Sequence, residues 1–151
     1  MSFASMGAVV AVALLAQQMT QEDMISEGEQ IGRAATAMGL CSGLGYSVDK
    51  DGGIAWARDF GDRAAGAGWD AALAERAIAS GSVAEEARMA PPSDAGLNAE
   101  QLRNAAATYI AKVKARCHRL HDEHGGLISN LDQGDRNADA QLAIMLRGLE
   151  R

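Results

Sequence analysis

Hydrophobic residues recur along most of the chain at alternating spacings of three and four, the pattern of helices that bury one face. The first such stretch, residues 21–42, follows Thr20, a residue type that caps helices. No segment alternates apolar and polar residues as a half-buried strand does. The pattern therefore predicts an all-α fold. The predicted buried face of the first helix consists of Met24, Gly28, Ile31, Ala35 and Met38.

A second helix is expected to start at Ser47 or Asp49 and to end at a pair of glycines before Trp69. It carries Trp56 and Phe60 one turn apart on the same face. Because large aromatic side chains dominate the cores they enter, we expect both tryptophans to be mostly buried and Phe60 to pack beside one of them.

Two short helices are predicted next, separated by Gly81. The first covers residues 69–80, and the sequence SVAE that starts at Ser82 opens the second as a capping box. The proline-rich residues 91–96 form the clearest linker in the chain.

The longest predicted helix covers residues 98–124 and is opened by a second capping box, NAEQ, at Asn98. A last helix is predicted over residues 138–149, after a polar loop. Neither side of the linker has many large apolar residues, so we expect both sides to share one core. The prediction is one domain over residues 17–151, an irregular bundle of five or six helices.

Residues 3–16 read FASMGAVVAVALLA and are followed at once by the polar sequence QQMTQED. As a helix this segment spans about 21 Å, short of the roughly 30 Å hydrocarbon core of a bilayer, so no stable membrane span is predicted. It has the length of the hydrophobic region of a signal peptide, although no Lys or Arg precedes it. We expect residues 1–16 to be a signal peptide and the protein to be periplasmic or secreted. The alternative is a cytoplasmic protein that retains the segment as a core helix.

The composition agrees with a helix-packing core, because aromatic residues make up only 4% while the chain contains 31 Ala and 17 Gly. The net charge of −6 is unfavourable for binding nucleic acid, which normally requires a basic stripe. One basic concentration, Lys112, Lys114, Arg116 and Arg119, lies on the long helix, and we interpret it as a solvated helix face.

The two cysteines, Cys41 and Cys117, each lie on or at the end of the apolar stripe of a predicted helix. One disulfide between the first helix and the long helix fits this placement, and an oxidising compartment would favour it. The alternative is two buried free thiols, since cysteine is among the most buried residue types.

No motif for catalysis or cofactor binding emerges. The glycine-rich sequence GLCSGLG that starts at Gly39 resembles a dinucleotide-binding string, but a helix precedes it where that use requires a strand. The chain has no GxSxG motif, and no carboxylate is predicted to lie on an apolar stripe. We therefore predict no catalytic residues and no cofactor, and the sequence favours a protein that is not an enzyme.

All three histidines lie within seven residues of the long helix: His118, His121 and His124. Imidazoles in such a cluster can bind Zn²⁺ or Cu²⁺. Adjacent members of the cluster are about 60° apart around the helix axis, so one helix can offer a pair but cannot direct all three inward. A core histidine with two surface histidines is the alternative interpretation.

Several short motifs are spread from the first cysteine to the last helix: Cys41, Gly68-Trp69, the sequence GSVAEEARM from Gly81, Cys117, and the sequence AIMLR from Ala143. In these motifs the chain resembles a group of small uncharacterised exported proteins of alphaproteobacteria, classed as a domain of unknown function. The resemblance implies an all-helical exported domain with one disulfide, and it implies no activity.

The sequence thus predicts a small exported helical interaction or accessory protein without catalytic activity, with a protein partner in the cell envelope. The alternative function is transition-metal binding through His118, His121 and His124. The oligomeric state is not determined by the sequence.

Overall fold

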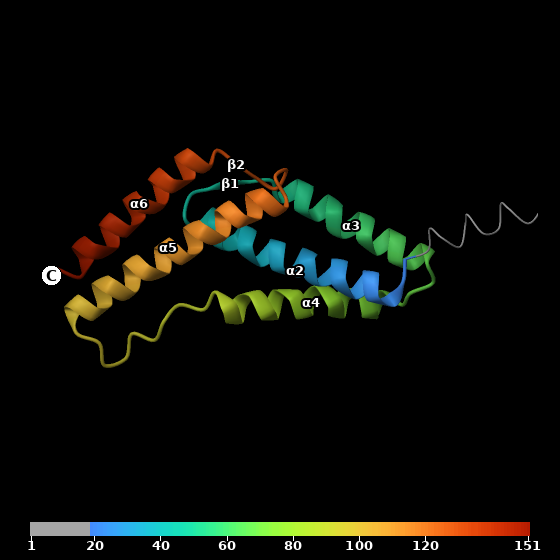
Figure 1. Cartoon of the computed structure of the whole chain (residues 1–151), viewed down its shortest axis with the longest axis horizontal. Coiled ribbons are helices and arrows are strands. Elements are labelled where there is room, and N and C mark those ends of the chain that lie inside the picture. Colours follow the sequence, from blue (N-terminus) through green and yellow to red (C-terminus); the bar gives the residue numbers. More distant parts are fainter. Residues whose placement is uncertain (1–18) are drawn as a thin grey trace, which may run out of the picture.

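A computed structural model of the protein describes residues 19–151 (Figure 1). Most of these residues are helical, and the prediction of an all-α fold is confirmed. The predicted signal peptide, residues 1–16, lies outside the described residues. The helices and strands are α2 (Gln21–Gly43), β1 (Ser47–Val48), α3 (Lys50–Gly66), α4 (Ala71–Arg88), α5 (Ala99–Glu123), β2 (Ile128–Ser129) and α6 (Leu131–Gly148).

The helices form two groups that share α2 (Figure 1). In the first group, α2 and α4 run side by side in the same direction and α3 returns in the opposite direction. In the second group, α5 crosses α2 and is followed by α6, which runs back along α5. The strands β1 and β2 pair antiparallel where the two groups meet, with Val48 opposite Ile128. Each strand has only two residues, too few to show an alternating pattern in the sequence.

The contact between α2 and α4 is a backbone-to-backbone contact made possible by glycines. A Cβ atom on Gly32 would lie 1.9 Å from the carbonyl oxygen of Ile78, and one on Gly81 would lie 2.0 Å from the carbonyl oxygen of Glu29. The Ser82 hydroxyl donates a hydrogen bond of 3.2 Å to the Gly32 carbonyl.

The predicted break at Gly81 is therefore wrong, because α4 continues through this position as one helix. The backbone of α2 lies so close to position 81 that only a residue without a Cβ atom fits there, and Gly81 does not end the helix. Ser82 likewise bonds to α2 and does not cap a new helix.

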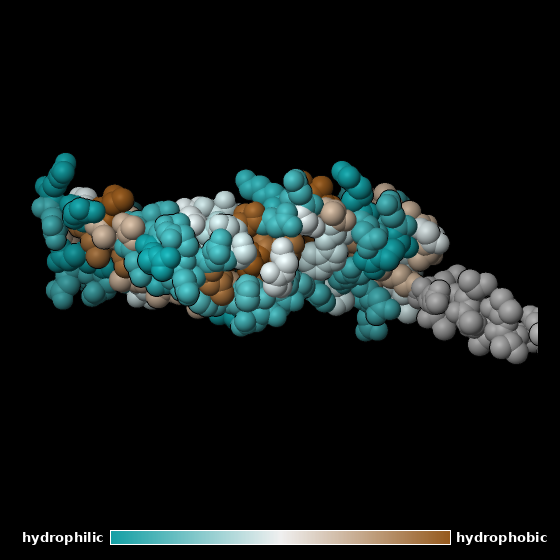
Figure 2. All heavy atoms as spheres, turned by 90° about the horizontal axis from the view of Figure 1, so that it is seen from above, coloured by the Kyte–Doolittle hydropathy of each residue, from teal (hydrophilic) through white to brown (hydrophobic). Residues whose placement is uncertain are grey.

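The interior consists of two hydrophobic clusters, one in each group of helices. In the first group Phe60 is fully buried in a cluster that also contains Met24 and Ile31. Trp56 and Trp69 pack against this cluster and keep part of their surface exposed. Their indole N–H groups donate to the Glu27 carboxylate and to a backbone carbonyl near the surface. Outside these clusters, apolar residues form only separate patches on the largely hydrophilic face shown in Figure 2.

The second cluster is built around a disulfide between Cys41 and Cys117, which confirms the predicted bridge. The two Cα atoms are 5.8 Å apart, and neither side chain is exposed. The bridge fixes the last turn of α2 to the second half of α5.

The last helix starts seven residues earlier than the predicted start at position 138. The first turns of α6 bury Gly134, on which a Cβ atom would lie 1.9 Å from the ring of Tyr46, and Ala138. Because the buried face of these turns is made of small residues, the sequence shows no stripe of large apolar residues there. Between residues 19 and 151, no helix is both long enough and apolar enough to span a bilayer.

Candidate functional site

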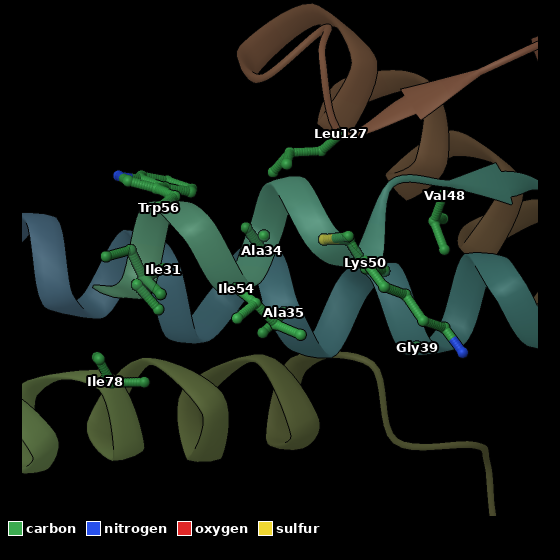
Figure 3. Close-up of a pocket in the computed structure, with 13 residues that line it drawn as sticks. Ile31, Ala34, Ala35, Gly39, Val48, Lys50, Ile54, Trp56, Ile78 and Leu127 are labelled. Carbon is green, nitrogen blue, oxygen red and sulfur yellow. The ribbon is translucent and has the colours of Figure 1, made fainter. Parts of the chain in front are cut away.

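A groove of about 400 Å³ opens between α2, α3 and α4 (Figure 3). Its volume falls within the range of pockets that bind small molecules. Apolar side chains from three helices and from the loop before β2 form most of its walls: Ile31, Met38, Ile54, Trp56, Ile78 and Leu127.

Small residues of α2 and α3 form part of the lining of the groove. On α2 these are Ala34, Ala35 and Gly39, and on α3 the small residue is Gly53. The side chain of Ile54 stands at the rim with 55% of its surface exposed. Ile54 and the apolar walls beside it form one contiguous apolar surface, and a contiguous exposed apolar patch marks a binding surface.

Among residues 19–151, Lys50 is the only charged residue that lines the groove. It is the first residue of α3, directly after the capping residue Asp49. A cation at the N-terminus of a helix is unfavourable because that end carries partial positive charge. Within residues 19–151 Lys50 forms no ion pair. Neither helix stability nor pairing within this part of the chain accounts for its position.

Trp56 is held in the groove wall by contacts on two sides. Its indole N–H donates to Glu27 Oε1 at 3.1 Å, and Glu27 also accepts hydrogen bonds from the Arg63 guanidinium. The pKa of Glu27 lies below its ordinary value, mainly because of the hydrogen bonds from Arg63. Partial burial raises this pKa, and the hydrogen bond from Trp56 lowers it further. On the other side the indole packs on the imidazole of His124, with ring centroids 4.7 Å apart.

The three candidate metal ligands have different partners. His118 hydrogen-bonds through Nε2 to Asp135 at 2.9 Å, His124 packs on Trp56, and His121 is exposed to solvent. In the range 19–151, no group of three His, Cys, Asp or Glu residues is placed to hold a metal ion. Metal binding by this cluster stays the alternative function, which zinc titration can test.

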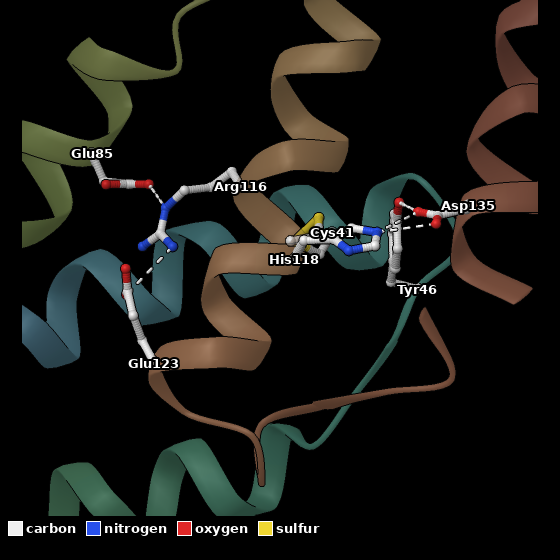
Figure 4. The surroundings of a disulfide bond; sticks show 8 residues. Cys41, Tyr46, Glu85, Arg116, His118, Glu123 and Asp135 are labelled. Carbon is white, nitrogen blue, oxygen red and sulfur yellow. Dashed lines mark hydrogen bonds and ion pairs between the residues drawn. A yellow bond between two sulfur atoms is a disulfide. The ribbon is translucent and has the colours of Figure 1, made fainter. Parts of the chain in front are cut away.

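The interpretation of the basic residues of α5 as a solvated face is wrong for Arg116. Arg116 is 4% exposed, and its Nε donates to the carboxylate of Glu85, which is 1% exposed (Figure 4). The neighbouring lysines are bonded on the surface, Lys112 to the Arg88 carbonyl and Lys114 to Asp139.

Glu85 also corrects the expectation that no carboxylate lies in an apolar region. It occupies a buried position of α4 between two exposed stretches of that helix. The sequence shows this only indirectly: Glu85 lies four residues after Gly81, on the face that approaches α2.

The lining of the groove suits binding and offers little chemistry. Apart from Lys50 and the indole N–H of Trp56, the described residues of its walls carry only hydrocarbon and thioether side chains, and no base lies beside a nucleophile among them. Comparison of the chain with models of known protein families, with curated proteins and with solved structures finds no match. The groove is therefore interpreted from its own geometry.

Proposed function

We propose that this protein is an exported, non-enzymatic helical binding protein of the cell envelope, which acts as an interaction or accessory protein. The groove between α2, α3 and α4 is its binding surface. The observation that carries the proposal is the combination of an open apolar volume of about 400 Å³ with an exposed isoleucine at its rim.

Export is supported by the disulfide between Cys41 and Cys117. Disulfides persist in oxidising compartments and are rare in the cytosol. The resemblance to small exported helical proteins with two cysteines points the same way, as does the apolar segment before residue 17.

Export is tested by intact-mass measurement of the protein purified from its native compartment. The expected mass is that of a chain beginning near Gln17 and carrying two hydrogens fewer than the reduced form. Cytosolic protein that retains Met1 or Ser2 would contradict export.

Binding at the groove is tested with N-phenyl-1-naphthylamine, an apolar dye whose fluorescence rises on leaving water. We expect saturable binding at one site, weakened about tenfold or more in Ile54→Asp because the charge would lie on the apolar wall. The matched control is Val83→Asp, since Val83 is 64% exposed on α4 and lies outside the groove. Equal dye binding by both variants would contradict the assignment of the groove.

A further inference from the structure

We propose that the groove binds the alkyl chain of a fatty acid and that Lys50 binds its carboxylate. This inference rests on the proposed function, because it names the ligand of the same groove. Three properties of the groove lead to it: its volume, its single charge and the arrangement of the two along its length.

The volume matches a single alkyl chain. An apolar cavity of about 150 Å³ takes up benzene, with six carbon atoms, so about 400 Å³ corresponds to a chain of roughly 16 carbons at most. A partner helix of ten residues, about 15 Å long and 10 Å across, occupies on the order of 1,000 Å³. Such a helix is too large for a groove of about 400 Å³.

The charge matches a carboxylate. Lys50 supplies one cation, and a fatty acid supplies one anion at the end of an apolar chain. The carboxylate of the neighbouring Asp49 already accepts a hydrogen bond from the backbone N–H of Gly52. A phosphate monoester carries up to two negative charges near neutral pH and would require more cations than the lining offers.

The two ends of the groove differ in polarity: one end is apolar and the other carries the charge of Lys50 (Figure 3). Ile31, Trp56 and Ile78 lie toward one end, and the ammonium group of Lys50 lies at the other. An amphiphile placed lengthwise therefore brings its alkyl chain against the isoleucines and its head group to the lysine.

The test is a chain-length series of alkyl carboxylates, from hexanoate to dodecanoate, measured by displacement of the dye below the micelle concentration. Burial of one methylene contributes about 0.8 kcal/mol, so each added methylene should tighten binding about fourfold until the groove is filled. Decanol, which has the same chain without the charge, is measured in parallel.

The variant Lys50→Gln distinguishes the contribution of the ligand's head group to the affinity from that of its alkyl chain. We expect it to weaken decanoate about tenfold and to leave decanol unchanged, because a hydrogen bond to a charged group is lost only for the acid. The matched control is Arg58→Gln, which removes one exposed cation from the same helix outside the groove and should change neither ligand.

The outcomes separate this inference from the proposed function. If Ile54→Asp weakens dye binding but no alkyl carboxylate displaces the dye, the fatty-acid assignment is wrong, while the groove is still a binding surface. An affinity independent of chain length, or an equal loss of decanoate and decanol in Lys50→Gln, also overturns the assignment. If neither dye nor carboxylate binds, both proposals fail.

Discussion

At the scale of single residues, Arg116 and Glu85 form an ion pair in the interior of the molecule. Arg116 Nη1 makes no hydrogen bond to the residues that the structure describes, and it lies 3.6 Å from the carboxylate of Glu123, which is 52% exposed. The guanidinium therefore depends mainly on Glu85 for compensation of its charge. Removal of one partner from a buried pair leaves an uncompensated charge in the interior.

Glu85→Gln should lower the free energy of unfolding by about 3 to 5 kcal/mol, as observed when buried pairs are broken. Glu123→Gln should cost about 1 kcal/mol or less, since its carboxylate is half exposed and screened by solvent. Urea unfolding measures both, with the exposed neighbour Glu86→Gln as the control. Equal midpoints for Glu85→Gln and Glu86→Gln would contradict the role of the buried pair.

A second residue-scale feature connects α6 to the rest of the molecule (Figure 4). Asp135 of α6 accepts hydrogen bonds from the hydroxyl of Tyr46 and from Nε2 of His118. Partial burial raises the pKa of Asp135, but these hydrogen bonds outweigh it and leave the pKa below its ordinary value. For Tyr46, burial and the neighbouring carboxylate raise the pKa, so the phenol remains protonated and donates.

The lowered pKa of Asp135 predicts a pH dependence with a definite sign. A carboxyl group whose pKa is lower in the folded state stabilises the fold above its unfolded pKa, near 3.9, and loses that contribution as the pH falls through the folded pKa. The unfolding free energy of wild type minus that of Asp135→Asn should be positive above about pH 5 and shrink toward acid.

Urea unfolding of both proteins at several pH values measures this difference. Asp139→Asn is the control, because Asp139 is 63% exposed and pairs with Lys114 at the surface. A difference between wild type and Asp135→Asn that grows below pH 4 would show that Asp135 is not stabilised as its contacts indicate.

At the scale of elements, the contact of α2 with α4 depends on Gly32 and Gly81. A methyl group at either position meets backbone atoms of the other helix. Backbone atoms cannot move aside as the end of a flexible side chain can, so the two helices would have to separate. That separation would also widen the groove, because Ile31 and Ile78 line it on either side.

Gly32→Ala should therefore destabilise the protein by about 3 kcal/mol or more, the upper part of the range for overpacked cores. Gly61→Ala is the control, because within the described part of the chain no atom beyond the neighbouring backbone of α3 lies within 4 Å of the added methyl group. This variant should gain about 0.5 to 1 kcal/mol from helix propensity. Thermal unfolding of the two variants decides the matter, and a Gly32→Ala protein as stable as wild type would exclude the close contact.

At the scale of the whole molecule, the disulfide ties the second half of α5 to the end of α2, the helix that the two groups share. It closes a loop of 76 residues that contains α3, α4 and the linker. By the chain-entropy estimate, closing a loop of this length in the unfolded chain stabilises the fold by about 4.5 kcal/mol.

Replacement of both cysteines, Cys41→Ala with Cys117→Ala, should lower the free energy of unfolding by about 2 to 5 kcal/mol. Addition of a reductant should shift the urea midpoint of wild type toward that of the double variant and leave the variant itself unchanged. A wild-type midpoint that does not respond to reductant, with both thiols shown to be free, would contradict a stabilising bridge.

The sequence by itself determined the features that depend on neighbouring residues. The capping boxes at Thr20 and Asn98 start α2 and α5 within a residue of the predicted positions, because a cap is a bond over three residues. Of the two predicted starts for α3, the structure selects Asp49, whose side chain accepts from Gly52. The disulfide was predictable as well, because both cysteines extend apolar stripes.

Only the tertiary structure decided the features that depend on which helix faces which. From the sequence alone, a glycine inside a helical pattern is interpreted as the end of the helix. At Gly81 in α4 the structure shows instead that another helix backbone lies against it. From the sequence alone, a charged residue is interpreted as exposed to solvent. For Arg116 the structure shows instead that it is buried and paired with the buried carboxylate of Glu85. The groove depends on how three consecutive helices pack and on Leu127, which comes from far along the chain. A gap left by small residues between them leaves no local pattern from which it could be predicted.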